Sequence, residues 1–237
     1  MVYANVFLVS CSYVYTEEDQ LNIFKIVITD ASSSDLVLFE AAGLLKDSLI
    51  REWNQVSEQD LKSLRTYLLN YVVQRTTLSA YVRERILQVV AIMVKRGSVE
   101  DLGADRGQIL NDVEQLVISG DSNQQMIACS VLAAIMQEYS SSVKSSDVGL
   151  RWEIHFRVKR QFEGTDLKRI FHFIVQALRA FGTDDRQMNR ETCLLLSRLL
   201  AIAESVLSWF FVPMTMLPKR LIGVFEADQN PSLRPGN

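Results

Sequence analysis

The sequence predicts an all-α protein, and three observations support this prediction. Apolar residues recur every three or four positions along almost all of the 237 residues, which places them on one side of each helix. The chain has only 10 glycines and 4 prolines, too few for the many tight turns of an all-β protein. Hydrophobic residues make up 48% and charged residues 22%, a balance typical of packed globular chains that excludes disordered, collagen-like and disulfide-scaffold classes.

Amphipathic stripes predict a series of helices along the chain. In each stripe the apolar residues share one helical face, which predicts that the helix packs against a neighbour on that side. The stripes run from Leu38 to Trp53, Leu61 to Val72, Leu78 to Met93, Ile109 to Val117, Ile127 to Tyr139, Leu150 to Phe162, Leu167 to Phe181, and Leu194 to Val206.

Helix-end signals accompany several of these stripes. Capping boxes, in which a serine precedes an acidic or amide side chain by three positions, are expected at Ser32 with Asp35, Ser57 with Asp60, and Ser122 with Gln125. Thr183 or Asp184 is expected to cap the last helix. Lys95, Arg96 and Gly97 predict the end of the third helix, because basic residues suit the negative end of the dipole and glycine suits a left-handed cap.

Residues 150–159 give a conflicting signal. Apolar and polar residues alternate strictly in LRWEIHFRVK, which is typical of a strand. A single strand would leave its backbone groups without ladder partners, and no comparable strand-like run lies nearby. Because Leu150, Ile154, Val158 and Phe162 also fit a helical spacing, we predict a short helix here.

Successive helix pairs begin near residues 57, 106, 147 and 184, at spacings of 49, 41 and 37 residues. HEAT and armadillo units repeat at about 40–47 residues, and stacked pairs of this kind bury a continuous core. We therefore expect a right-handed α-α superhelix of HEAT or armadillo type, formed by residues 17–237 as one domain of about five helix pairs. Residues 1–16 are expected to lie outside this domain, as an atypical N-terminal segment.

Charge and cysteine content narrow the class of partner and the compartment. The net charge of −3 disfavours a dedicated nucleic-acid binder, which is usually basic. Three widely separated cysteines are typical of reduced thiols inside the cell. Residues 1–16 carry no charge, but they lack the basic start of a signal peptide and are shorter than the 18 or more apolar residues of a membrane span. No membrane span is expected.

Sequence motifs for catalysis, cofactors and metals are missing. The chain has no G-x-G-x-x-G, no G-K-[ST] and no G-x-S-x-G, and its two histidines lack the spacing of metal ligands. We expect no catalytic residue, cofactor or metal, although a cysteine–histidine pair that meets only in space stays open. His172 is expected to have a packing role. The basic residues between Arg151 and Arg169 are expected to be solvated, with an acidic partner surface as the alternative.

Six stretches of the sequence resemble a known family. They are LFEAAGLLKDSLIREW (38–53), LRTYLLNYVVQR (64–75), YVRERILQVVAIMVKRGSVED (81–101), QQMIACSVLAAIMQEYSSS (124–142), GLRWEIHFRVKRQFE (149–163) and SVLSWFF (205–211). Over roughly residues 21–233 the chain is similar to the exportin-4 branch of the importin-β superfamily of nuclear transport receptors.

This resemblance implies a HEAT-repeat solenoid that carries protein cargo through the nuclear pore and shuttles between nucleus and cytoplasm. The B helices, here residues 34–53, 78–97 and 122–140, would line a concave face that binds Ran-GTP. The A helices would form the convex face, where Phe-Gly nucleoporins dock. The polar residues of the B helices that the resemblance makes candidates for Ran contacts are Asp35, Glu40, Arg83, Gln88, Lys95, Arg96, Gln124 and Glu138.

The chain departs from the family pattern in two respects. Residues 1–16 do not resemble the family's opening helix, and family members are several times longer than this chain. We therefore expect an N-terminal portion without the acidic loop and distal arch that complete Ran and cargo binding in the superfamily. The alternative function is a HEAT-type interaction scaffold that lacks Ran-dependent transport, and an enzyme is not expected.

Overall fold

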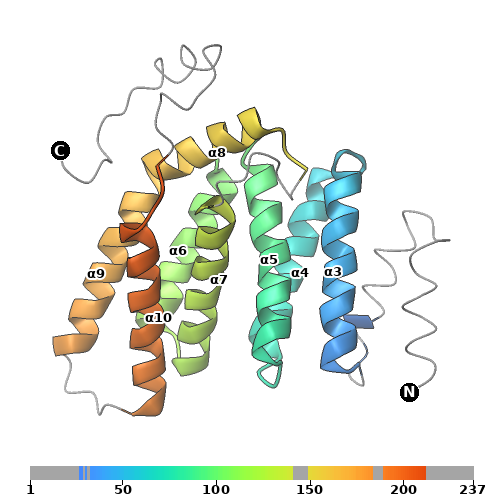
Figure 1. Cartoon of the computed structure of the whole chain (residues 1–237). Coiled ribbons are helices and arrows are strands. Elements are labelled where there is room, and N and C mark those ends of the chain that lie inside the picture. Colours follow the sequence, from blue (N-terminus) through green and yellow to red (C-terminus); the bar gives the residue numbers. More distant parts are fainter. Residues whose placement is uncertain (1–26, 29, 31–32, 141–148, 184–188, 212–237) are drawn as a thin grey trace. The chain divides into compact units, whose positions relative to one another are not determined.

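A computed structural model of the protein describes residues 27, 28, 30, 33–140, 149–183 and 189–211 (Figure 1). These residues contain eight α-helices, labelled α3 to α10, one 3-10 turn and no strand. The all-α prediction is confirmed, and the packed helices are those of a HEAT-like repeat protein. By their contacts they fall into two units, residues 1–93 and 94–237, with the boundary inside helix α5.

The first unit contains helices α3 (Asp35–Glu52) and α4 (Glu58–Gln74), the 3-10 turn η1 (Trp53–Gln55) and most of α5 (Ala80–Gly97). Helices α3 and α5 contact each other directly, because the Phe39 and Tyr81 rings lie 5.7 Å apart. The predicted apolar stripes form the core of this unit. Its buried apolar residues include Leu38, Leu45 and Leu49 of α3, Leu64, Leu68 and Val72 of α4, and Val82, Ile86 and Val90 of α5.

The second unit contains five further helices. They are α6 (Ala104–Ser119), α7 (Ser122–Ser140), α8 (Trp152–Thr165), α9 (Leu167–Thr183) and α10 (Arg190–Leu207). Helix α7 packs on α6 and α10, and α9 packs on α8 and α10, so that α10 lies against both α7 and α9 (Figure 1). The core between them is formed by side chains of the predicted stripes, among them Ile109, Val113, Ile135, Phe162, Ile174 and Leu199.

The helix ends confirm one predicted cap and correct two others. Ser57 accepts a hydrogen bond from the Asp60 backbone N–H at 3.1 Å, as a capping box requires. Helix α7 is capped one residue earlier than predicted, by reciprocal bonds between Asp121 and Gln124, because the Gln125 side chain is buried and donates to the Val117 carbonyl. Helix α10 begins after Asn189, whose side chain accepts from the Thr192 N–H.

The predicted start of α3 and the predicted glycine cap of α5 are not found as expected. Ser32 and Asp184 lie outside the described residues, and the N-cap of α3 is Ser34 without a side-chain cap bond. Gly97 is the last residue of α5, but the left-handed glycine of this loop is Gly103, with φ +85°. Helix α6 then begins where the Asp101 carboxylate accepts from the N–H groups of Gly103 and Asp105.

Residues 152–165 form helix α8, as predicted against their alternating pattern. The buried residues include His155, Lys159, Phe162 and Glu163, which recur at the helical spacing of three and four. Ile154, which both the alternation and the predicted helical stripe would bury, is only half-buried, whereas Lys159, which alternation would expose, is fully buried. Helical packing against neighbouring elements therefore outweighs the local strand-like signal.

Candidate protein-binding surface

The candidate residues of α3 are Asp35 and Glu40, and they differ in their surroundings. Asp35 lies in the first turn, is half-buried and accepts a hydrogen bond from the Ser79 hydroxyl at the start of α5. Glu40 lies further along the helix and is exposed. The Asp35 carboxylate therefore holds two helices of the first unit together, whereas Glu40 is accessible to a partner.

Helix α5 provides Arg83 and Gln88, with Arg85 between them. Arg83 is half-buried, and its Nε has no hydrogen-bond partner among the described residues. Gln88 is half-buried and accepts a hydrogen bond from Arg85 at 2.8 Å. The sequence reasoning missed Arg85, whose guanidinium lies 5.3 Å from the Phe39 ring centroid. A Cβ at Gly43 would approach Arg85 Nη2 to 3.1 Å, so the glycine leaves space for this contact.

The remaining candidates belong to the second unit, and two of them bind each other. Lys95 Nζ donates to Glu138 Oε1 at 2.8 Å and to the Glu138 carbonyl at 2.7 Å, and its side chain is only 1% exposed. Burial lowers the pKa of Lys95, although the Glu138 carboxylate acts in the opposite direction. Arg96 is also buried, and burial lowers its pKa. Lys95 and Arg96 therefore do not simply cap a helix end in solvent, as their sequence position suggested.

Gln124 has a local structural role. Its side-chain oxygen accepts from the Asp121 N–H at 3.0 Å, and its own N–H donates to the Asp121 carboxylate at 2.8 Å. These two bonds satisfy donors at the start of α7, which would otherwise have no intrahelical acceptor. Gln124 is half-buried, so part of its surface is still open to solvent.

A buried polar network in the second unit was not identified from the sequence. Arg106 of α6 donates to Asp166 at 2.6 Å, to the Ser98 hydroxyl at 3.0 Å and to the Tyr139 hydroxyl at 3.1 Å. Its guanidinium also lies 5.2 Å and 5.5 Å from the ring centroids of Tyr139 and Phe162. Burial raises the pKa of Tyr139, although Arg106 and Ser98 act in the opposite direction. The network joins residues up to 60 positions apart, which is why local pattern could not reveal it.

A second buried cluster joins α8 to the segment after α10. Trp209 donates its indole N–H to Glu163 at 3.0 Å, and its ring lies 5.6 Å from that of Phe162. Lys159 Nζ lies 5.1 Å from the Trp209 ring centroid and donates to the Ser140 carbonyl at 3.0 Å. Burial raises the pKa of the Glu163 carboxyl, although Trp209, Lys159 and Arg160 act in the opposite direction. Trp209 is thereby packed on its own chain.

Three members of the predicted basic cluster have partners within the chain, the longest pair being Arg160 with Glu163 at 3.9 Å. Lys159 is buried as described, and Arg169 binds Glu114 at 2.7 Å and Asn111 at 2.6 Å. Arg151, Arg157 and Lys168 are exposed. Only part of the cluster is therefore available to an acidic partner surface.

The described residues contain no group of three or more histidine, cysteine, aspartate or glutamate side chains that could hold a metal ion. His172 is exposed, contrary to the packing role expected for it, whereas His155 is buried. Cys129 is buried in α7, and burial raises the pKa of its thiol to about 12, which opposes formation of a nucleophilic thiolate. In the described part of the chain, no helix is long and apolar enough to cross a membrane.

Helix pairs packed through apolar stripes, with polar groups bound to one another inside, define a helical-repeat protein of the HEAT type. A family model described as Exportin-4 matches residues 14–237. The exportin-4 of Dictyostelium discoideum is 22% identical over 207 residues, which are 80% of this chain and 18% of that protein. The chain belongs to the exportin-4 family, and it spans less than a fifth of the length of that relative.

Proposed function

We propose that this chain is the Ran-GTP-binding N-terminal region of a nuclear transport receptor that exports protein cargo. The single observation that carries the proposal is the match of the exportin-4 family model to residues 14–237. The packing of the described helices is consistent with it, because the predicted B helices correspond to α3, α5 and α7. The proposal includes one HEAT domain formed by residues 17–237.

Exposed and half-buried side chains make the direct contacts with Ran in this proposal. In the first unit they are Glu40, Arg83 and Gln88. Arg83 makes no ion pair in the described part of the chain, and although its Nε is buried, the exposed part of this half-buried side chain can meet a partner carboxylate. In the second unit Gln124 is half-buried and contributes its remaining surface.

In this proposal the buried candidates hold the surface in place and do not contact Ran directly. Lys95 and Glu138 fix α5 to α7 within the second unit, and Asp35 fixes α3 to the start of α5 within the first. Removing one partner of a buried ion pair leaves a charge without compensation. A charge reversal at Lys95 therefore confounds binding with folding, and Arg83 is the better residue to test.

The other partners follow from the family. Phe-Gly nucleoporins would dock on the A helices, and protein cargo would be carried jointly with Ran-GTP. The protein would shuttle between nucleus and cytoplasm. It would act as a receptor and not as an enzyme.

A pull-down tests this proposal. The full chain is immobilised and incubated with Ran loaded with GTP or with GDP, and retention of the GTP form alone is expected. Arg83→Glu should reduce retention about tenfold or more, because it places a carboxylate where an acidic group would bind. Arg65→Glu is the matched control, since Arg65 is a half-buried arginine of the A helix α4. Retention of neither nucleotide form of Ran, or equal retention of both, would favour the scaffold alternative.

A further inference from the structure

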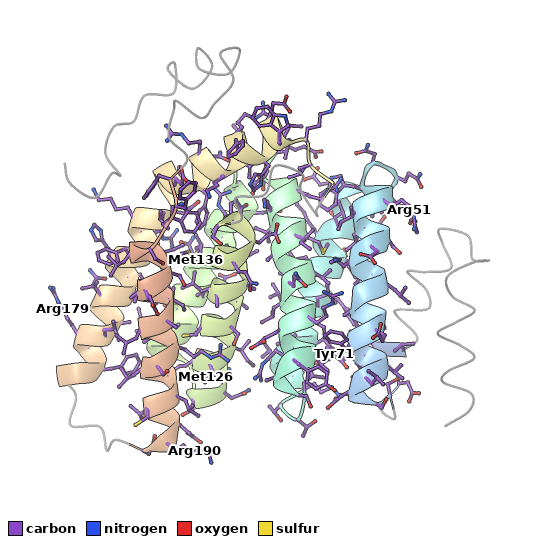
Figure 2. The ribbon with its side chains drawn as sticks, viewed as in Figure 1. Arg51, Tyr71, Met126, Met136, Arg179 and Arg190 are labelled. Atoms are coloured by element: carbon purple, nitrogen blue, oxygen red, sulfur yellow. The ribbon has the colours of Figure 1, made fainter. Side chains whose placement is uncertain are left out.

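The first unit carries an apolar cluster where helices α3 and α5 begin. We define the α3–α5 apolar cluster by Leu36, Phe39 and Tyr81. Leu36 is 60% and Tyr81 49% exposed, and the half-buried Phe39 ring lies 5.7 Å from the Tyr81 ring. Leu36 lies one helical turn before Phe39, so the three side chains form a continuous surface. Tyr71 of α4 lies at the same end of the unit, and Arg51 lies at the opposite end of α3 (Figure 2).

A strongly apolar segment precedes this cluster in the chain. Residues 1–16, which lie outside the described residues, carry no charge, and twelve of them are hydrophobic. Exposure of such a segment to water is unfavourable. The exportin-4 family model begins only at residue 14, so most of the segment lies outside the matched part of the chain. A segment of this composition requires an apolar surface to cover it.

We propose that residues 1–16 bind the α3–α5 apolar cluster of their own chain. The point at which the chain enters α3 supports this occupant. Ile28 is buried, and the Val27 carbonyl accepts a hydrogen bond from the Ser33 hydroxyl at 2.8 Å, directly before the N-cap of α3. The segment is therefore joined to the end of α3 that carries the cluster through residues 17–26.

The length of this connection favours the contact. Ten extended residues span at most about 36 Å, and α3, with 18 residues, is about 27 Å long, so the segment reaches the cluster. A short tether also raises the local concentration of the segment to the order of 1 mM. Contacts that are too weak to hold a separate peptide are therefore strong enough to hold this segment.

Charge complementarity supports the same contact. Arg85 of α5 lies one turn after Tyr81, and its guanidinium lies 5.3 Å from the Phe39 ring centroid. Arg85 makes no ion pair within the described residues, since its partner there is the Gln88 side chain. Residues 17–19 are all acidic and follow the apolar segment directly. With the segment on the cluster, these carboxylates come within reach of Arg85.

The contact would also shield part of the proposed Ran surface, and this consequence rests on the proposed function. Glu40 follows Leu36 by four positions and Gln88 follows Tyr81 by seven, so each pair shares one side of its helix. A segment bound to the cluster therefore lies next to both proposed contacts. Its release should raise the affinity of the chain for Ran-GTP.

Limited proteolysis of the full chain tests the contact without Ran. Chymotrypsin cleaves after accessible aromatic residues, and cleavage within residues 1–16 tracks the population in which the segment is released. Replacing Leu36 and Tyr81 together by serine should speed this cleavage at least about tenfold. Ile118→Ser is the matched control, because Ile118 is 64% exposed on α6 of the second unit. If the double variant loses helical circular dichroism, Leu36→Ser alone gives the test, since this side chain is mostly exposed.

The concentration dependence of cleavage distinguishes this occupant from others. The rate for residues 1–16 should not change on dilution of the chain, because the contact is intramolecular. Protection that is lost on dilution would assign the cluster to a second copy and overturn the proposal. Equal cleavage of the segment in the unaltered chain and in the Leu36 and Tyr81 variant would also overturn it.

Substitutions in the segment itself test the effect on Ran. Phe7→Asp with Leu8→Asp should release the segment and increase retention of Ran-GTP about tenfold in the pull-down, because the occupied surface becomes available. Asn5→Asp with Ser10→Asp is the matched control, since it adds the same charge at two polar positions. Unchanged retention would show that the segment does not shield the Ran contacts. Cleavage is measured without Ran, so the contact and the proposed function fail or succeed separately.

Discussion

Arg106 is the residue on which the polar interior of the second unit depends. Its guanidinium is 1% exposed and binds Asp166 at 2.6 Å, while two hydroxyls and two aromatic rings occupy its remaining sides. Asp166→Ala should therefore lower the free energy of unfolding by about 3–5 kcal/mol, because it leaves a buried charge uncompensated. Urea denaturation measures this change.

The matched control for that substitution is Glu58→Ala. Glu58 binds Lys62 at a similar distance, 2.7 Å, but the Glu58 side chain is 74% exposed and that of Lys62 45%. Solvent screens such pairs, so the loss should be about 0.5 kcal/mol or less. Losses of equal size in the two variants would show that burial of the Arg106 pair has no energetic consequence.

Glu163 should make stability depend on pH. Burial raises the pKa of its carboxyl, so the folded state holds the proton more tightly than the unfolded chain does. Its contribution to stability is therefore fully present below the ordinary carboxyl pKa near 4.5 and decreases as the pH rises through the folded-state pKa. Glu163→Gln cannot ionise, and its amide oxygen can still accept from Trp209.

Denaturation of the two proteins at several pH values checks this expectation. The stability of Glu163→Gln relative to the unaltered chain should increase as the pH rises above about 4.5. A difference that is constant with pH would mean that the Glu163 carboxyl titrates alike in the folded and unfolded states.

At the scale of elements, the loop before α6 depends on Gly103. The residue has φ +85°, and a Cβ there would lie 2.4 Å from Arg106 Nη2. Gly103→Ala should cost about 2 kcal/mol or more, because it combines backbone strain with displacement of the buried guanidinium. Gly107 lies one turn later in α6, and a Cβ there would meet nothing within 4 Å. Gly107→Ala should instead stabilise the protein by about 0.5–1 kcal/mol, and thermal denaturation of both variants separates these opposite signs.

The elements also show what local pattern predicts and what it does not. Stripes of apolar residues identified the helices, including α8, because helical periodicity follows from burial on one side. Local pattern predicts the starts of helices less accurately than their apolar faces. Gln125 fits a capping box with Ser122 by spacing, yet its side chain turns to the Val117 carbonyl, and Gln124 with Asp121 forms the cap instead. The buried partners of Arg106 and Trp209 come from distant helices, and no local spacing encodes such contacts.

At the scale of the whole molecule, the sequence predicted which polar residues lie on the candidate helices but not which of them are exposed. It could not separate Lys95, which is buried against Glu138, from Arg83, which keeps a guanidinium without an ion partner in the described residues. Both are basic residues of α5, and Lys95 differs because Glu138 of α7, within the second unit, accepts its hydrogen bonds. Accessible and structural polar residues are therefore distinguished by packing.

Export requires that Ran-GTP and cargo raise each other's affinity for one receptor. The chain matches 18% of its Dictyostelium relative. We therefore expect it to supply only part of the surface that couples Ran-GTP to cargo. Ran-GTP should not increase retention of nuclear extract proteins on the immobilised full chain, and the chain should not restore export in receptor-depleted cells. Restored export would show that these residues suffice for coupling.

The affinity of the full chain for Ran-GTP, measured by titration calorimetry beside Ran-GDP, tests the proposed function most directly. Weak binding of Ran-GTP is predicted, at a dissociation constant of about 1 μM or above, because only part of the receptor surface is present. No heat of binding is predicted for Ran-GDP. Identical behaviour of the two nucleotide forms, with a correctly folded helical chain, would contradict a Ran-dependent role.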